Sequence, residues 1–303
     1  MIHYYQSILK MGNCFCCSSE EEFVRAAIKL PNGVDSIQYD NSSGKFVPIK
    51  NINDWISELY KGSNWTSWLV YNDDTSELDI KGTAKGHCKG ILAWNNEHIS
   101  WLIHSVPNFP RVFKGDTISD IEEGEHIYGQ SFCYTQYTYT KSKHDNILQQ
   151  LVLMEPHIFN KQMEGELPKS TKSNEIKELS FSDNICHIAK SPVHNIDIYS
   201  EYLCKKDKSI WTVETWKRGS KIKKCSTNML DVETLTYEQT IFKDSQDHSK
   251  WAACEEYCFI GDLNRMESQS KRGGGGILIR DKKMARAFQG LVDEVVIKFV
   301  KPE

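Results

Sequence analysis

The chain has 303 residues, of which 39% are hydrophobic and 11% aromatic, and its formal net charge at pH 7 is −4. This composition indicates a folded protein with a substantial core, in one large or two smaller domains, and excludes a disordered chain. The charge excludes a strongly basic nucleic-acid binder at neutral pH. Protonation of all ten histidines would bring the formal charge to +6, so an anionic polymer would be attracted more strongly in acid.

The first twenty residues are interpreted as a tail that precedes the folded part. Polar residues interrupt the apolar run from Ile2 to Leu9, so no signal peptide is visible there. No later stretch has the length and apolar character of a membrane span. A start at Met11 would give Met-Gly-Asn-Cys-Phe-Cys-Cys, which is similar to a myristoylation start beside palmitoylation sites. An N-terminal lipid anchor is therefore expected only if translation begins at Met11.

Strand patterns occur in both halves of the remaining chain. A strand-and-turn pattern leads to residues 39–44, and residues 65–71 are rich in β-forming side chains before an Asn-Asp-Asp turn. Residues 89–94 and 98–106 predict a hairpin, which the two prolines after Ser105 end. Alternation of Trp211, Val213 and Thr215 predicts a further strand over residues 210–216.

Apolar residues at helical spacing predict helices over residues 53–60, 144–155 and 284–299. Asn53 or Asp54 is expected to cap the first helix, and Asp281 the last. Residues 161–178 are polar and rich in Lys and Glu, which predicts a linker or surface segment. This divides the chain into a tail over residues 1–20, a first half over 21–160, that linker, and a second half over 179–303.

Two His-x-Lys segments carry the chemistry that the sequence offers: Gly86-His87-Cys88-Lys89-Gly90 and Asp247-His248-Ser249-Lys250-Trp251. In an extended segment the His and Lys side chains share one face, which places an imidazole and an ammonium in the same space. A phosphodiester needs such a pair, a proton carrier or nucleophile and a fixed cation for its charged oxygens. On spacing alone, surface strand residues without a chemical role are an equal alternative.

Polar clusters follow each of these segments, a loose sign of internal duplication. The first cluster is His104-Ser105, and the second is Gly261-Asp262-Leu263-Asn264-Arg265. His104 and Ser105 are candidates to face the site, although a core histidine and a strand-end hydroxyl are equally good interpretations. Two basic segments are candidates for backbone phosphate contacts. These are residues 217–224, where a solvated loop is the favoured interpretation, and Lys271-Arg272 ahead of the glycine run 273–276.

Together these segments resemble the deoxyribonuclease II family. The resemblance covers about residues 23–300 and includes both His-x-Lys segments and the cluster 261–265. It also includes five further segments: Lys29-Leu30-Pro31, Leu69-Val70-Tyr71-Asn72-Asp73, Trp101 to Pro110, Tyr128-Gly129-Gln130-Ser131 and Arg272-Gly273-Gly274-Gly275.

The resemblance implies an α/β, phospholipase D-like fold with two similar halves about a pseudo-twofold axis. It further implies metal-independent cleavage of double-stranded DNA in acid, through a phosphohistidine, with 3′-phosphate ends and no cofactor. The implied catalytic residues are His87, Lys89, His248, Lys250 and Asn264, with His87 as the favoured nucleophile. The candidate substrate-binding residues are His104, Ser105, Lys271 and Arg272.

The chain departs from the family pattern at three residues. Cys88 replaces the usual Thr, a change expected to affect packing more than chemistry, and Ala252 and Ile279 replace cysteines, so an expected disulfide is absent. By resemblance the compartment is lysosomal or otherwise acidic, with the cytoplasm as the alternative since no signal peptide is visible. The alternative functions are a phospholipase D-like phosphodiesterase with another substrate and a non-catalytic DNA-binding relative.

Overall fold

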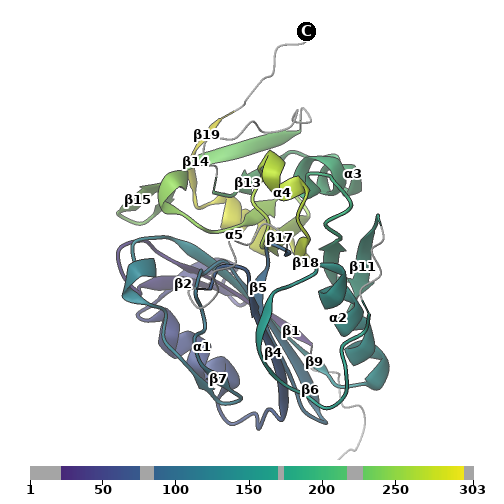
Figure 1. Ribbon diagram of the computed structural model, residues 1–303. Coiled ribbons are helices and arrows are strands. Elements are labelled where there is room, and N and C mark those ends of the chain that lie inside the picture. Colours follow the sequence, from purple (N-terminus) through teal and green to yellow (C-terminus); the bar gives the residue numbers. More distant parts are fainter. Residues whose placement is uncertain (1–21, 76–84, 170–173, 217–227, 297–303) are drawn as a thin grey trace, which may run out of the picture.

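Two large β-sheets that face each other form most of the protein. The computed structural model describes residues 22–75, 85–169, 174–216 and 228–296. In Figure 1 the first sheet lies below in purple and blue, and the second lies above it in green and yellow. The fold is mixed α/β, with few and short helices.

The first sheet has eight strands, and every neighbouring pair in it is antiparallel. Its strand order is β10 (Ile158–Gln162), β4 (Ser67–Asn72), β5 (Lys89–Trp94), β6 (His98–His104), β9 (Gln130–Thr138), β1 (Phe23–Lys29), β2 (Ser36–Asp40) and β3 (Lys45–Ile49). A short hairpin of β7 (Phe113–Lys114) and β8 (Thr117–Ile118) lies outside this sheet.

The second sheet is built from later residues and has nine strands, with one parallel pair, β13 and β14. Its strand order is β11 (Ile176–Ser180), β12 (Ile185–Lys190), β18 (Gly274–Arg280), β17 (Tyr257–Gly261), β16 (Trp251–Ala253), β13 (Trp211–Glu214), β14 (Met229–Tyr237) and β15 (Thr240–Lys243), while β19 (Val292–Val296) pairs with β14.

The centres of the two sheets have corresponding strand orders. The path β4-β5-β6-β9-β1-β2 in the first sheet corresponds to β13-β16-β17-β18-β12-β11 in the second. In both paths the second and third strands form a hairpin, and a His-x-Lys segment stands at the start of that hairpin. The two motifs therefore occupy corresponding places in the two sheets.

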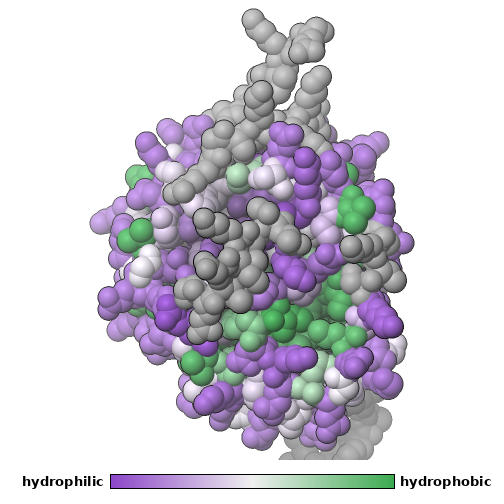
Figure 2. Space-filling model, viewed as in Figure 1, coloured by the Kyte–Doolittle hydropathy of each residue, from purple (hydrophilic) through white to green (hydrophobic). Residues whose placement is uncertain are grey.

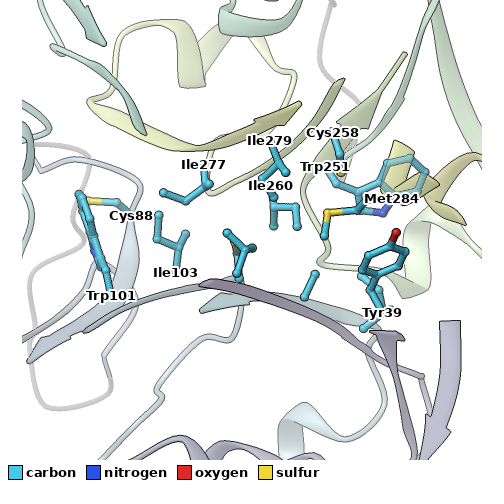
Figure 3. Packing of buried hydrophobic residues seen from close by; sticks show 14 of the residues in the cluster. Tyr39, Cys88, Trp101, Ile103, Trp251, Cys258, Ile260, Ile277, Ile279 and Met284 are labelled. Atoms are coloured by element: carbon cyan, nitrogen blue, oxygen red, sulfur yellow. The ribbon is translucent and has the colours of Figure 1, made fainter. Parts of the chain in front are cut away.

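The largest hydrophobic core lies between the sheets. Figure 3 shows Trp101 and Ile103 of the first sheet beneath Ile260, Ile277 and Ile279 of the second. Both inner faces are apolar because alternate residues of each strand point to this side. Burial of each large side chain contributes roughly 1.5–3 kcal/mol, so this layer holds the two sheets together.

Two smaller cores cover the outer faces. Helix α1 (Ile52–Tyr60) packs Ile52, Ile56, Leu59 and Tyr60 against the first sheet, a spacing that forms one helical face. The π-helix η2 (Ile198–Leu203) and the short α3 (Cys204–Lys206) cover the second sheet. Figure 2 shows a largely hydrophilic face with smaller hydrophobic areas, in agreement with this burial of apolar side chains.

The remaining helices connect or flank the sheets. Helix α2 (Lys141–Leu153) follows β9 and packs beside β11 and β12, and α5 (Lys282–Gln289) packs beside β16, β17 and β3. Three short segments complete the list: η1 (Glu123–Glu125), η3 (Asp244–Gln246) and α4 (Glu267–Ser270). Within the described ranges, no helix is both long and apolar enough to span a bilayer.

The predicted helices over residues 53–60 and 144–155 are confirmed, and the first has a different cap from the one predicted. Asn51 caps α1, because its side chain accepts a hydrogen bond from the Asn53 N–H at 2.9 Å. Helix α2 begins earlier than predicted, at Lys141, and Thr140 caps it. The predicted hairpin and the strand near residue 211 are also confirmed as β5–β6 and β13.

The predicted last helix is correct only in its first half. Asp281 caps α5 as expected, but the helix ends at Gln289. The following segment is strand β19, because its valines pair with β14 and β-branched residues favour a sheet. The segment predicted as a linker or surface contributes its first residues to β10 and its last to β11.

Cys88, which replaces a family threonine, is fully buried in the core between the sheets, and its expected effect on packing stays a prediction. The six cysteines within the described ranges are free thiols. Ala252 lies in the outer core of the second sheet, and Ile279 lies in the core between the sheets. The N-terminal tail, with the conditional lipid anchor, lies outside the described residues, as does the basic run 217–224.

Candidate active site

Each His-x-Lys segment is held by a loop of the opposite sheet. The His87 N–H donates to the Gly273 carbonyl, immediately before β18, at 2.8 Å. The His248 N–H donates to the Gly129 carbonyl, immediately before β9, also at 2.8 Å. Gly129 additionally forms a parallel bridge with Asp247. The two motifs therefore meet where the sheets come together.

The charges of the two motifs act on one another. Burial and the positive charge of Lys89 lower the pKa of Lys250 to about 7. Burial lowers the pKa of His87 to about 3, and the charges of Lys89 and Lys250 add to that effect. Such mutual effects require short separations in a weakly screened environment. The site thus combines His87, Lys89 and Lys250 in one electrostatic unit.

His87 is oriented by its ring nitrogen. Its Nδ1 lies 2.5 Å from the carbonyl oxygen of Asp262, in the loop after β17. Because a carbonyl only accepts, Nδ1 carries the proton and Nε2 holds the lone pair. His87 is partly exposed, so Nε2 is the ring atom suited to attack an electrophile.

His248 lies in a different environment, between aromatic rings and a carboxyl group. The Tyr128 ring stacks on it with 4.0 Å between centroids and 15° between planes, and Trp216 is 4.2 Å away at 39°. Its Nδ1 lies 4.0 Å from an oxygen of Glu125. Burial raises the pKa of Glu125 to about 7, and the negative charge of Asp74 adds to the shift.

Lys89 is paired with a carboxylate that also joins the two sheets. Asp73, just after β4, forms ion pairs with Lys89 and, at 2.7 Å, with Arg272. Arg272 also donates to the carbonyls of Lys85 and Gly86. Burial works against the ionised form, but Lys89, His87 and Arg272 outweigh it and hold the pKa of Asp73 well below its usual range.

Two polar side chains follow β17, of which Asp262 lies beside His87. The Asp262 carboxyl accepts from the Gly275 N–H at 2.8 Å, and burial raises the pKa of Asp262 to about 8. Asn264 is buried, and its Oδ1 has no hydrogen-bond partner among the described residues. An unsatisfied buried acceptor in a polar site is available to a ligand.

Of the four candidate substrate-binding residues, two lie at or beside the site and two are buried. Arg272 lies at the site, and Lys271 beside it is exposed. His104 is buried against Phe109, and burial lowers its pKa to about 3. Ser105 is also buried. Direct substrate contact stays a prediction for all four.

Ser105 connects instead to the second motif through Ser131. Its hydroxyl accepts from the Ser131 N–H at 2.9 Å, and the Ser131 hydroxyl accepts from the Lys250 N–H at 3.1 Å. Ser105 therefore supports Lys250 from the first sheet.

Five residues near the motifs had no assigned role from the sequence: Asp73, Glu125, Tyr128, Trp216 and Asp262. Asp73, Tyr128 and Asp262 fall inside segments that carry the family resemblance, so a signal existed for them. Glu125 is one of three acids close in sequence, and nothing in the pattern distinguishes it. Within the described residues, no group of three or more His, Cys, Asp or Glu side chains could hold a metal ion.

Facing sheets that each contribute a His-x-Lys segment to one polar centre define a mixed α/β protein with a paired His–Lys site. A family model described as Deoxyribonuclease II matches residues 37–296. The chain belongs to the deoxyribonuclease II family.

Three curated relatives show the extent of the similarity. Deoxyribonuclease-2 of Caenorhabditis elegans is 30% identical over 280 residues, covering 82% of this chain and 73% of the relative. Deoxyribonuclease-2-beta of Mus musculus is 28% identical over 261 residues, covering 77% and 72%. Cell-death-related nuclease 7 of C. elegans is 28% identical over 302 residues, covering 87% and 80%.

Proposed function

We propose that this protein is an acid endodeoxyribonuclease that hydrolyses double-stranded DNA without a metal, through a phosphohistidine intermediate, and leaves 3′-phosphate ends. The observation that carries the proposal is the convergence of two His-x-Lys segments, each held by the opposite sheet. Membership of the deoxyribonuclease II family and relatives named as deoxyribonucleases support DNA as the substrate.

His87 is the nucleophile in this mechanism. Its pKa of about 3 keeps the imidazole neutral at pH 5, and its Nδ1–H···O=C bond to Asp262 leaves Nε2 unprotonated. Nε2 attacks phosphorus, the bond to the 5′-oxygen breaks, and a protonated His248 gives its proton to that oxygen. The 3′-side of the DNA is then attached to His87 through its phosphate.

Water completes the reaction. His248, now neutral, removes a proton from a water molecule, which attacks phosphorus and displaces His87 Nε2. The product keeps the phosphate on its 3′-oxygen, and both histidines return to their initial states. Lys89 and Lys250 stabilise charge on the non-bridging oxygens, and Asn264 offers a further polar contact.

Acid favours the charge states that this mechanism needs at Lys250, Asp262 and Glu125, while the low pKa of His87 keeps that ring neutral. At pH 5 Lys250, with a pKa of about 7, is protonated, while Asp262, with a pKa of about 8, is neutral and does not repel a phosphate. Glu125, with a pKa of about 7, is mostly neutral as well. The working compartment proposed is therefore lysosomal or otherwise acidic, with the cytoplasm as the alternative.

The corresponding strand orders support two similar halves about a pseudo-twofold axis, as in a phospholipase D-like fold. The proposed halves are residues 21–160 and 179–303. One catalytic pair from each half meets the other at the axis.

Plasmid nicking between pH 4 and 8 with EDTA tests the function, together with end-group analysis of the products. His248→Ala should reduce the rate at pH 5 by at least about 10³-fold, because both the general acid and the later general base are lost. His98→Ala is the matched control, since His98 begins β6 at the end opposite the site. It should retain the rate.

Three results would contradict the proposal. Normal nicking by folded His248→Ala would remove the assigned mechanism. Cleavage of a lipid or nucleotide phosphodiester by the wild-type protein, without DNA cleavage, would favour another phosphodiesterase. DNA binding without nicking would favour a non-catalytic relative.

A further inference from the structure

Lys29, the last residue of β1, is fully buried and surrounded by backbone carbonyls. Its ammonium donates to the carbonyls of Leu30 and Gly33 at 3.0 Å each, which lie in the turn after β1. It also donates to the carbonyls of His126 at 3.1 Å and Tyr128 at 2.6 Å, in the loop before β9. The ammonium therefore ties that loop to the end of β1.

Lys190, the last residue of β12, has the corresponding arrangement in the second sheet. It is fully buried, and its ammonium donates to the carbonyls of Ser191 at 3.4 Å and His194 at 3.2 Å. It also donates to Ser270 at 2.8 Å and Arg272 at 2.5 Å, in the segment before β18. β12 corresponds to β1, and β18 to β9, in the strand order.

The two lysines thus make the same set of contacts. Each binds the carbonyls one and four residues after itself, and two carbonyls that are two residues apart in a loop before a central strand. A fully buried ammonium is costly unless its protons are hydrogen-bonded, so each lysine strongly favours this loop conformation. A solvated lysine would impose no such constraint.

The next residue of each loop holds the histidine of the opposite half. Tyr128, bound by Lys29, precedes Gly129, whose carbonyl accepts from the His248 N–H. The Tyr128 ring itself stacks on His248.

Arg272, bound by Lys190, precedes Gly273, whose carbonyl accepts from the His87 N–H. A side chain at Gly273 would place its Cβ 2.0 Å from the Met154 carbonyl oxygen. The close approach of this loop to Met154, at the C-terminal end of α2, is therefore part of the arrangement, and a displaced loop would carry the His87 backbone with it.

We propose that Lys29 and Lys190 are positioning residues that act across the molecule: Lys29 of the first half fixes His248, and Lys190 of the second half fixes His87. The role in catalysis rests on the proposed function, but the crossed placement is a property of the fold. Loss of either lysine should misplace one histidine only, and a misplacement of about 1 Å can reduce a rate about 100-fold.

Ring signals of isotopically labelled histidine test the crossed pattern by NMR, with assignments from His87→Ala and His248→Ala. Lys29→Met should shift the signals of His248 and leave those of His87 unchanged, and Lys190→Met should do the reverse. Each should reduce plasmid nicking at pH 5 about 100-fold. Asn95→Ala is the control, because it removes partly buried hydrogen bonds with the Ser63 carbonyl and the His98 N–H at the far end of β5 and β6. It should change the signals of neither histidine.

If the Met variants do not fold, Lys29→Gln and Lys190→Gln replace them. A glutamine side chain keeps two N–H donors, so these variants should show the same crossed pattern with smaller shifts of the histidine signals. Amide hydrogen exchange gives a second readout: Lys29→Gln should accelerate exchange at His248, and Lys190→Gln at His87. Shifts confined to the histidine of the same half, or equal shifts at both, would overturn the proposal. These signals do not depend on catalysis, so a wild-type protein without nuclease activity would contradict only the proposed function.

Discussion

His87 and His248 share a motif, and their environments assign them different tasks. The carbonyl of Asp262 fixes the proton on Nδ1 of His87, and burial keeps that ring neutral in acid. His248 has aromatic faces and the Glu125 carboxyl beside its Nδ1 instead. A neutral ring suits attack on phosphorus, and a ring next to a titratable carboxyl suits proton transfer. In the proposed mechanism, the order of the two steps therefore rests on residues outside the motif.

Glu125→Gln should change the nicking rate at pH 8 more than at pH 5. With a pKa of about 7, Glu125 is mostly neutral at pH 5, where an amide of the same shape replaces it well. The nicking rate at pH 5 should stay within about threefold of wild type. At pH 8 the ionised carboxylate favours the protonated form of His248, and the variant lacks this effect, so its rate should fall further than that of wild type.

The measurement is a pH profile of plasmid nicking for both proteins. Equal losses at pH 5 and pH 8 would show that Glu125 acts through packing alone. Glu123→Gln, an exposed acid two residues earlier, is the matched control and should follow the wild-type profile.

At the scale of elements, short helices depend on their caps and on the core beneath them. Helix α5 has eight residues, too few for stability by propensity alone. It places Met284 and Phe288 in the core between the sheets, and Asp281 caps it with bonds from the Lys283 and Met284 N–H groups at 2.8 and 3.1 Å. Burial and Asp281 together raise the pKa of Tyr39 to about 12, which indicates contact with the first sheet.

Asp281→Ala should lower the free energy of unfolding by about 1–2 kcal/mol, because two N–H groups of α5 lose their partner. The nicking rate of the folded protein should not change, since α5 packs beside β16, β17 and β3 and contributes nothing to the site. Urea unfolding measures the loss. Asp281→Ser retains a capping oxygen and should recover most of it; an equal loss in both variants would contradict the capping explanation.

The sequence predicts local structure here better than it predicts the site. Alternation and turn residues place the β5–β6 hairpin correctly, and the His-x-Lys spacing singles out the two segments that the structure brings together. The end of α5 is mispredicted because Val292, Val295 and Val296 also fit helical spacing, and only pairing with β14 decides between the two. Glu125 is missed because its proximity to His248 depends on how two sheets stack, which periodicity does not encode.

At the scale of the whole molecule, the site also contains polar contacts that connect the two sheets. Asp73 of the first sheet binds Lys89 beside it and Arg272 of the second sheet, and both side chains of this ion pair are largely buried. Backbone bonds from His87 to Gly273 and from His248 to Gly129 cross the same boundary. Separation of the sheets would therefore pull the two His-x-Lys segments apart, so stability and the proposed activity should fall together.

The cross-sheet ion pair should persist in acid. The pKa of Asp73 is lowered in the folded protein, so its ionisation stabilises the fold above the unfolded-state pKa of about 4. That contribution is lost only as the pH falls below this value toward the lower folded-state pKa. Asp73→Asn should thus lower the free energy of unfolding by about the same amount at pH 5 as at pH 7. The loss should be roughly 3 kcal/mol, because the substitution leaves buried cations without their partner.

A double-mutant cycle with Arg272→Gln, followed by urea unfolding at pH 7, 5 and 3, measures the pair itself. At pH 7 and 5, the loss of unfolding free energy in the double variant should be about 1–3 kcal/mol smaller than the sum of the losses in the two single variants. That difference should shrink at pH 3, where Asp73 becomes protonated in the unfolded chain. The exposed pair of Glu58 and Lys61 is the matched control, and its cycle should give less than about 1 kcal/mol at every pH. Additive losses for Asp73 and Arg272 at pH 5 would mean that the sheets are held by their apolar faces alone, and that acid operation needs no ionic joint.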